Sequence, residues 1–326
     1  MAGAQERILR RRIKSVESAK KITRAMELIA ASRIVKAQAR VQAAVPYSDE
    51  ITKVVRNLAA ASTGLENDYL TARSEITRVA HVAIAGDRGL AGAYNANVIR
   101  ATEGAIREHR EQGRDYALFP VGRKAEGYFR FREFSIGEAF GGFTDKPSYE
   151  NAREISAAIN TAFLEGDIDQ VDLIYTRFVT AGFQEVVLRP LIPLEAEVVA
   201  GEDEIITADE RHAVAGYEFE PTPDAILERL LPRYLEARVY AALLNAAASE
   251  HAARQTAMKA ATDNAEELKT TLSRQMNRAR QDAITTEIME IVGGAEALRS
   301  GAVATETEPA LVDAGEAGYI LGSDGT

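Results

Sequence analysis

The Gly-rich stretch "GDRGLAGAYN" at residues 86–95 is the strongest candidate for chemistry in this sequence. It follows a predicted strand and opens a predicted helix, so Gly86, Gly89 and Gly92 could let backbone amides cradle a phosphate. Its spacing matches neither GxGxxG nor GxxxxGK[ST], and no acidic residue lies at a clear strand end about 20 residues later. The simpler interpretation is a structural turn in which Asp87 caps free amides. Partner contact and nucleotide binding stay open as alternatives.

Other reactive residue types offer little. The chain has no cysteine, which excludes disulfides, thiolate metal sites and cysteine nucleophiles and fits a cytosolic compartment. No serine or threonine lies in GxSxG or beside a histidine. The four histidines are far apart and lack metal-ligand spacing, so we expect no histidine metal site; they are His81, His109, His212 and His251. We therefore predict no catalytic residues, no metal and no cofactor.

A polar group near the end of the chain has a different character. In "RARQDAITTEIMEIVGG", Arg280, Gln281 and Thr285 lie within about one and a half helical turns, beside the small residues Ala279 and Ala283. A solvated helix face would look like this. So would a helix that buries one face in a mate and offers the others to a second partner, and both interpretations stay open.

Charge is unevenly distributed along the chain. From Met1 to Arg56 there are 13 basic and 5 acidic residues, a net charge of +8. The whole chain has a net charge of −10, so the remaining 270 residues have a net charge of −18. Such asymmetry indicates a segment that faces a partner. The basic stretch is helical and its only aromatic residue is Tyr47, which argues against a nucleic-acid arm.

Long helices are predicted at both ends of the chain. Residues 1–64 include 42 consecutive residues without Gly or Pro (4–45), worth roughly 63 Å of helix, with a bend expected at Pro46. Residues 224–299 include 60 such residues (233–292), worth roughly 90 Å. Apolar seams run along both helices. The first seam comprises Leu9, Ile13, Val16, Ala19, Ile22, Met26 and Ile29; the second comprises Leu268, Leu272, Met276, Ala279, Ala283, Thr286 and Met289.

The middle of the chain, residues 77–200, alternates strand and helix patterns, and "VDLIYTRFVT" and "QEVVLRPLIPLE" read as a β-hairpin. An acidic connector follows at 201–223, and residues 300–326 form an acidic tail that we expect to be disordered. Long isolated helices are unstable in water, so the two terminal helices should pair. The predicted fold is therefore α/β: a long antiparallel coiled coil of N- and C-terminal helices with an inserted small Rossmann-like α/β domain.

Three segments together resemble one known family. "RRRIKSVESAKKITRAMELIAASRIVKAQ", "GDRGLAGAYN" and "EHAARQTAMKAATDNAEEL…NRARQDAITTEIMEIVGGAEAL" are similar to the gamma subunit of the rotary ATP synthase, of the bacterial type. The resemblance covers residues 1–299 in the family's order. It implies a central stalk that turns inside a ring of alpha and beta subunits, stands with epsilon on the membrane c-ring, and performs no bond chemistry. It also implies a peripheral location on the cytoplasmic side of the cell membrane, without lipid insertion.

The resemblance assigns roles to particular residues. It implies contact with the beta subunit at Ile22, Met26, Arg280, Gln281 and Thr285. A few charge-assisted hydrogen bonds at one angle would hold a rotational dwell. It implies that a basic contact segment meets acidic levers on beta through long-ranged electrostatics; this segment comprises Arg10, Arg11, Arg12, Lys20, Lys21 and Arg24. Three apolar residues outside the first seam are also expected to face a partner: Leu28, Ile34 and Val35.

Two rival functions follow from the same elements. A coiled-coil scaffold or adaptor with an α/β head would work as a homodimer, whereas a rotor would be a single copy in a hetero-oligomer. An enzyme with a nucleotide-binding α/β domain would bind nucleotide by itself.

Overall fold

The computed structural model describes residues 2–61, 68–71, 73–194, 220 and 222–303. The chain divides into two units. The larger is Ser18–Glu266, and the smaller combines Met1–Glu17 with Glu267–Thr326. The long helices α1 (Ala2–Ala61) and α7 (Pro223–Val303) each contribute to both units.

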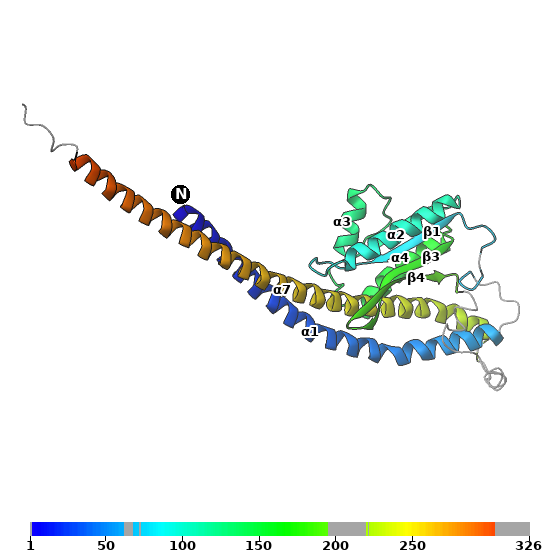
Figure 1. Cartoon of the computed structure of the whole chain (residues 1–326). Coiled ribbons are helices and arrows are strands. Elements are labelled where there is room, and N and C mark those ends of the chain that lie inside the picture. The colour runs from blue at the N-terminus through cyan, green and yellow to red at the C-terminus, as the bar shows by residue number, and fades with distance from the viewer. Residues whose placement is uncertain (1, 62–67, 72, 195–219, 221, 304–326) are drawn as a thin grey trace, which may run out of the picture. The chain divides into compact units, whose positions relative to one another are not determined.

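A sheet forms the centre of the larger unit (Figure 1). It has four strands in the order β2-β1-β3-β4. β1 (Arg78–Ile84) pairs in parallel with β2 (Asp115–Val121) and with β3 (Gln170–Thr180). β4 (Phe183–Ile192) pairs antiparallel with β3, so the predicted hairpin is confirmed. The parallel pairs require crossover helices, which the alternating strand and helix patterns predicted.

Helices cover both faces of the sheet. Successive strand residues point to opposite faces, so Ala83 of β1 joins the core under α2 (Tyr94–Glu111) and α3 (Arg123–Phe131). Val82 and Ile84 of β1 join the opposite core, with residues of α1, α4 (Tyr149–Leu164) and α7. A Ser148 side chain begins α4 with a capping box closed by Asn151. The inserted domain is thus a three-layer α/β structure.

The two long helices pair in an antiparallel manner within each unit. In the larger unit, Thr23 Oγ1 lies 2.8 Å from Thr262 Oγ1, and Lys20 pairs with Glu266. In the smaller unit, Lys269 Nζ lies 3.0 Å from Glu17 Oε1. An apolar cluster accompanies that pair, and it comprises Leu9, Ile13, Val16, Leu272, Met276 and Ala279.

The predicted seam of α1 is right at its start and wrong further along. Ile22 is 61% exposed and Ile29 54% exposed, although both were expected to face the second helix. Ala30 (1%) and Ile34 (5%) are buried instead. Ile34 was expected to face an outside partner, so that expectation is also wrong. The side of α1 that faces its mate is therefore displaced from the most apolar side.

Polar residues explain this displacement. The inward positions of α1 step alternately by four and three residues, the heptad spacing of a coiled coil, and this row passes through Lys20, Thr23 and Glu27. Thr23 and Lys20 find polar partners on α7, so they are satisfied inside the interface. A prediction based only on the spacing of apolar residues excludes these three polar positions. It therefore selects the neighbouring face of the helix.

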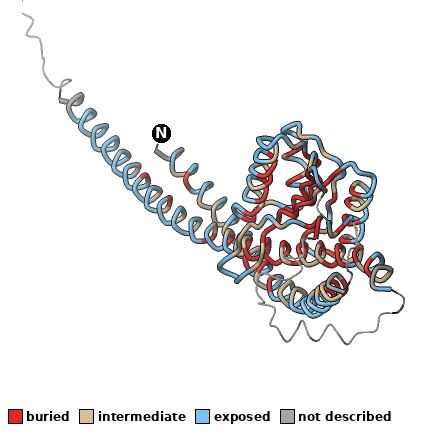
Figure 2. Tube along the Cα trace, turned by 90° about the vertical axis from the view of Figure 1, so that its right-hand side faces the viewer, coloured by how far each residue is buried: buried red, intermediate tan, exposed pale blue. Residues whose placement is uncertain are grey.

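The far end of α7 is uncovered in the smaller unit. Leu272 and Ala279 are buried as predicted, but Leu268 is 48% exposed and Met289 69% exposed, and Thr286 is also exposed. Every residue from 284 to 299 is exposed (Figure 2). Ala279, which packs in the same cluster as Leu9 of α1, is the last buried residue of α7 in the part of the chain that the structure describes. We call residues 284–299 the free end of α7.

Several boundaries differ from the predicted ones. α1 continues through Pro46, and α7 contains Pro232 and extends to Val303, four residues into the expected tail. Most of the acidic connector and the rest of the tail lie outside the described residues. Among the residues that the structure describes, no helix has a window apolar enough, over sufficient length, to cross the membrane.

Candidate functional site

The Gly-rich turn is organised around Asp87. Its Oδ1 accepts hydrogen bonds from the backbone amides of Arg123 (3.1 Å) and Gly142 (2.9 Å), and its Oδ2 accepts from the Thr144 amide (3.0 Å). Burial raises the pKa of the Asp87 carboxyl, but the hydrogen bonds from Gly142, Thr144 and Arg123 outweigh burial and lower it overall. Asp87 therefore joins three loops and caps the first amide of α3, not of the helix that its own turn opens.

Amides of the turn are used within the protein. The Gly86 amide donates to Asn95 Oδ1 at 2.8 Å, and the Asp87 amide donates to Thr144 Oγ1 at 2.8 Å. Gly92 has a φ of +57°, a conformation that glycine adopts without strain. Because these two amides already have acceptors, the geometry favours a structural turn over a phosphate cradle.

Helix α7 packs directly against this turn. Arg254 Nη2 lies 2.6 Å from Glu250 Oε1 and donates to the Gly89 carbonyl at 3.3 Å. Both side chains are at least nine-tenths buried. Burial raises the pKa of Glu250, while the hydrogen bond and charge of Arg254 oppose that rise. The residues "EHAAR" of α7 thus hold the inserted domain, a role that their sequence alone did not suggest.

Ile22 and Met26 lie in different surroundings. Ile22 is exposed on α1, whereas Met26 is half-buried and lines a cavity of about 290 Å³ with Ile29, Leu90 and Arg33. The cavity lies between α1, the Gly-rich turn and α7, all within the larger unit. Their contact with another subunit stays a prediction.

The basic segment divides into internally paired and exposed residues. Lys20 pairs with Glu266 across the two helices. Arg10 and Arg24 pair with acidic residues three or four positions away on α1. The remaining members are exposed on α1, and they are Arg11, Arg12 and Lys21. These three are the better candidates for an intermolecular role.

Arg280, Gln281 and Thr285 are all exposed on α7, next to the buried Ala279. Thr285 Oγ1 donates to the Gln281 carbonyl at 3.0 Å, so its hydroxyl is satisfied within the helix. These residues precede or begin the free end of α7, where the exposed apolar side chains comprise Ile284, Ile288, Met289, Ile291, Val292 and Leu298.

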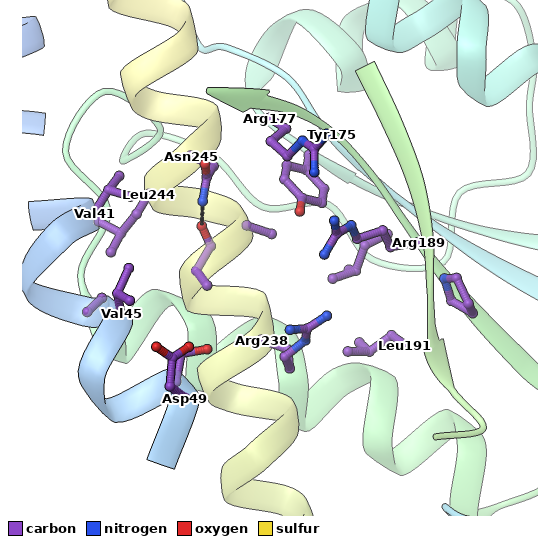
Figure 3. A pocket seen from close by; sticks show the side chains of 16 residues that line it. Val41, Val45, Asp49, Tyr175, Arg177, Arg189, Leu191, Arg238, Leu244 and Asn245 are labelled. Carbon is purple, nitrogen blue, oxygen red and sulfur yellow. Dashed lines mark hydrogen bonds between the residues drawn. The ribbon is translucent and has the colours of Figure 1, made fainter. Parts of the chain in front are cut away.

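A second cavity, of about 200 Å³, lies between α1, α7 and the β3–β4 hairpin (Figure 3). Arg177, Arg189 and Arg238 line it on one side, and Asp49 of α1 lines the other. Arg177 is paired with Glu185. None of its lining residues comes from the Gly-rich turn, so the cavity adds no support for nucleotide binding at that turn.

The expectation that the histidines are far apart is wrong for two of them. His81 Nε2 lies 3.2 Å from His109 Nδ1, and Asp172 lies beside His81 with an Nδ1–Oδ2 distance of 3.8 Å. The fold brings them together because His81 and Asp172 are in register on parallel strands and α2 returns His109 over them. The sequence feature that could have pointed to this cluster is the polar residue inside each of the apolar strands "RVAHVAI" and "QVDLIYT".

Known proteins match this chain over nearly its whole length. The family model described as ATP synthase matches residues 5–298. The ATP synthase gamma chain of Parafrankia sp. is 50% identical over 306 residues, covering 93% of this chain and all of that protein. The gamma chain of Thermobifida fusca is 46% identical over 308 residues, with 93% of this chain and all of that protein covered.

Solved structures show the same fold. A chain of the Euglena gracilis mitochondrial ATP synthase, in an OSCP, F1 and c-ring assembly, has a TM-score of 0.65 at 17% identity and covers 94% of this chain and 99% of its own. A chain of the Tetrahymena thermophila mitochondrial ATP synthase central stalk and c-ring has a TM-score of 0.55 at 24% identity, with 74% and 99% covered.

Proposed function

This chain belongs to the family of ATP synthase gamma chains, and on that premise we propose that its paired helices turn inside a ring of alpha and beta subunits. It is the central stalk of the catalytic sector, the rotor shaft that couples c-ring rotation to the catalytic sites. Proton flow turns the c-ring and the shaft together. Because the shaft is asymmetric, each beta site meets a different face in turn and changes its affinity for nucleotide.

The observation that carries this proposal is the free end of α7. Ile284, Ile288 and Ile291 repeat at helical spacing and are 46%, 54% and 66% exposed. A single helix does not hold such residues in water without a partner, since helical stability comes mainly from packing. A surrounding apolar sleeve would cover this end on all sides while leaving it free to turn.

Specific contacts would mark angular positions on this shaft. We assign Arg280, Gln281 and Thr285 to a loop of beta near the free end, and Ile22 and Met26 to the lever region of beta. Arg11, Arg12 and Lys21 would meet acidic side chains on the levers, where long-ranged attraction tolerates rotation. The inserted α/β domain would stand with epsilon on the c-ring, which gives the chain a peripheral place on the cytoplasmic side of the membrane.

Reconstitution with the alpha and beta subunits tests the proposal. The chain should assemble as one copy with three alpha and three beta subunits, and the complex should hydrolyse ATP. Arg280→Ala and Gln281→Ala should lower turnover at least about fivefold, equivalent to ~1 kcal/mol at the rate-limiting step. Arg130→Ala is the control, because Arg130 is exposed on α3 of the inserted domain, outside the surfaces assigned to beta, and pairs with Glu126 of its own helix.

Each failure has a distinct meaning. If the chain forms a homodimer and does not bind the alpha and beta subunits, the scaffold interpretation would be favoured over the rotor. Nucleotide binding by the isolated chain would support the interpretation that it is an enzyme with a nucleotide-binding α/β domain. Normal turnover of both alanine variants in a correctly assembled complex would show that the beta contact lies elsewhere on the shaft.

A further inference from the structure

A cluster of two histidines and one aspartate lies on the α2 side of the sheet, away from the surfaces assigned to rotation. His81 comes from β1, Asp172 from β3 and His109 from the last turn of α2. One ligand atom from each of the three residues can be chosen so that all lie within 4.8 Å of one another. His81 and Asp172 are 0% and 1% exposed, and His109 is half-buried.

Two polar atoms of this cluster lack partners among the described residues. His81 Nδ1 and Asp172 Oδ2 are buried without a hydrogen bond, and their separation of 3.8 Å is too long to form one. The other oxygen of Asp172 accepts from Gln170 Nε2 at 2.9 Å. Buried polar atoms without partners are costly and rare in native proteins, so Asp172 Oδ2 is a donor available to another group.

The donor set selects the kind of group. Two imidazole nitrogens and one carboxylate oxygen are typical ligands of Zn²⁺ and related divalent transition metals, whereas Mg²⁺ and Ca²⁺ prefer six or more oxygens. Two nitrogens bound to one tetrahedral Zn²⁺ are separated by roughly 3.3 Å, given Zn–N bonds of about 2.05 Å. His81 Nε2 and His109 Nδ1 are 3.2 Å apart, which is close to this separation and is also a hydrogen-bond distance.

We propose that His81, His109 and Asp172 bind one divalent transition-metal ion of the zinc class. Small side-chain rotations bring the three donors onto one ion, and water takes the fourth position. The half-buried His109 is the entry side. The ion links β1, β3 and α2, so its role is structural, and it stabilises the inserted domain by mass action.

Titration of the full-length chain tests this proposal. After treatment with a chelator, the wild type should bind one Zn²⁺ per chain in calorimetry and should melt at a higher temperature with Zn²⁺. Co²⁺ in its place should give the visible absorption of a tetrahedral complex. His109→Gln and Asp172→Asn should weaken binding at least about tenfold. His251→Gln is the matched control, because His251 is a buried histidine of α7 that contacts the Asp145 carbonyl instead.

Circular dichroism must first show that each variant is folded, and His109→Gln is the safer substitution because its site is half-buried. Zn²⁺ binding of equal strength in wild type, His109→Gln and Asp172→Asn would overturn the proposal. So would the absence of saturable binding by the wild type.

Discussion

The Glu250 carboxyl group lies so close to Gly86 that a Cβ atom added at Gly86 would be 2.9 Å from Glu250 Cδ. Glu250 is 1% exposed and is held by Arg254, so it has little freedom to move away. The Gly-rich turn and α7 are therefore shaped to each other. This contact gives the glycine at position 86 a packing reason that requires no ligand.

Replacing Gly86 by alanine should destabilise the larger unit. The added methyl group meets both Glu250 and Asn95 Oδ1, which lies 3.1 Å from the Cβ position. Overpacking of this kind costs typically about 1–3 kcal/mol, measured as a lower midpoint in urea denaturation. Gly104→Ala is the control: it is inside α2, and apart from its chain neighbours and the backbone of that helix no atom lies within 4 Å of its Cβ position. That variant should be neutral or slightly stabilised.

Replacing only one partner of the Arg254–Glu250 pair should destabilise the protein more than replacing both. Arg254→Met leaves the Glu250 carboxylate buried without its counter-ion, and the expected loss is about 3–5 kcal/mol. The double variant Glu250→Gln with Arg254→Met removes both charges and should recover part of that loss. Denaturation of wild type, both single variants (Glu250→Gln and Arg254→Met) and the double variant measures the coupling. Equal destabilisation would mean that packing, not charge, dominates at this contact.

The displaced seam of α1 can be tested with two isoleucines on the same helix. Ile34→Ala should cost about 2–4 kcal/mol, because Ile34 is buried at 5% exposure and its loss leaves a cavity. Ile29→Ala should change stability by less than about 0.5 kcal/mol, because Ile29 is 54% exposed. Thermal unfolding of both variants is sufficient. The reverse order would restore the seam expected from apolar spacing.

Asp169 should make stability depend on acid pH. Its Oδ2 accepts from the amide and hydroxyl of Thr77 and from the Arg78 amide, and its Oδ1 accepts from Arg73. Burial raises its pKa, but Thr77, Arg73 and Arg78 together lower it from 3.8 to about 2. The folded state thus holds its proton less tightly than the unfolded state. The ionised carboxylate stabilises the fold above pH 4, and this contribution is lost as pH falls towards 2.

Asp169→Asn should accordingly lose at most about 2 kcal/mol at pH 7, and the difference from wild type should shrink between pH 4 and pH 2. Urea denaturation at pH 7, 4 and 3 measures it. A difference that is independent of pH would assign the effect to hydrogen-bond geometry instead of charge.

The order of strands and helices in the inserted domain could be predicted because it depends on local patterns. "RVAHVAI" and "DYALFPV" are β-rich runs followed by glycine and a helical pattern, and such runs form strands with little dependence on the rest of the chain. The pairing of the terminal helices followed from their length, since neither could persist in water unpaired. The sequence also predicted that Asp87 accepts hydrogen bonds from backbone amides. The helix that it caps, however, is α3 and not α2, which its own turn opens.

Contacts between distant segments were decided only by the tertiary structure. The true seam of α1 passes through Thr23 because Thr262 is opposite, and a pattern of apolar residues has no means of recording a satisfied polar pair. His81, His109 and Asp172 meet because strand register and the return of α2 place them together, over separations that spacing rules do not cover. Residue types and periodicity therefore determined the elements, while hydrogen bonding and register across the fold determined which of their faces meet.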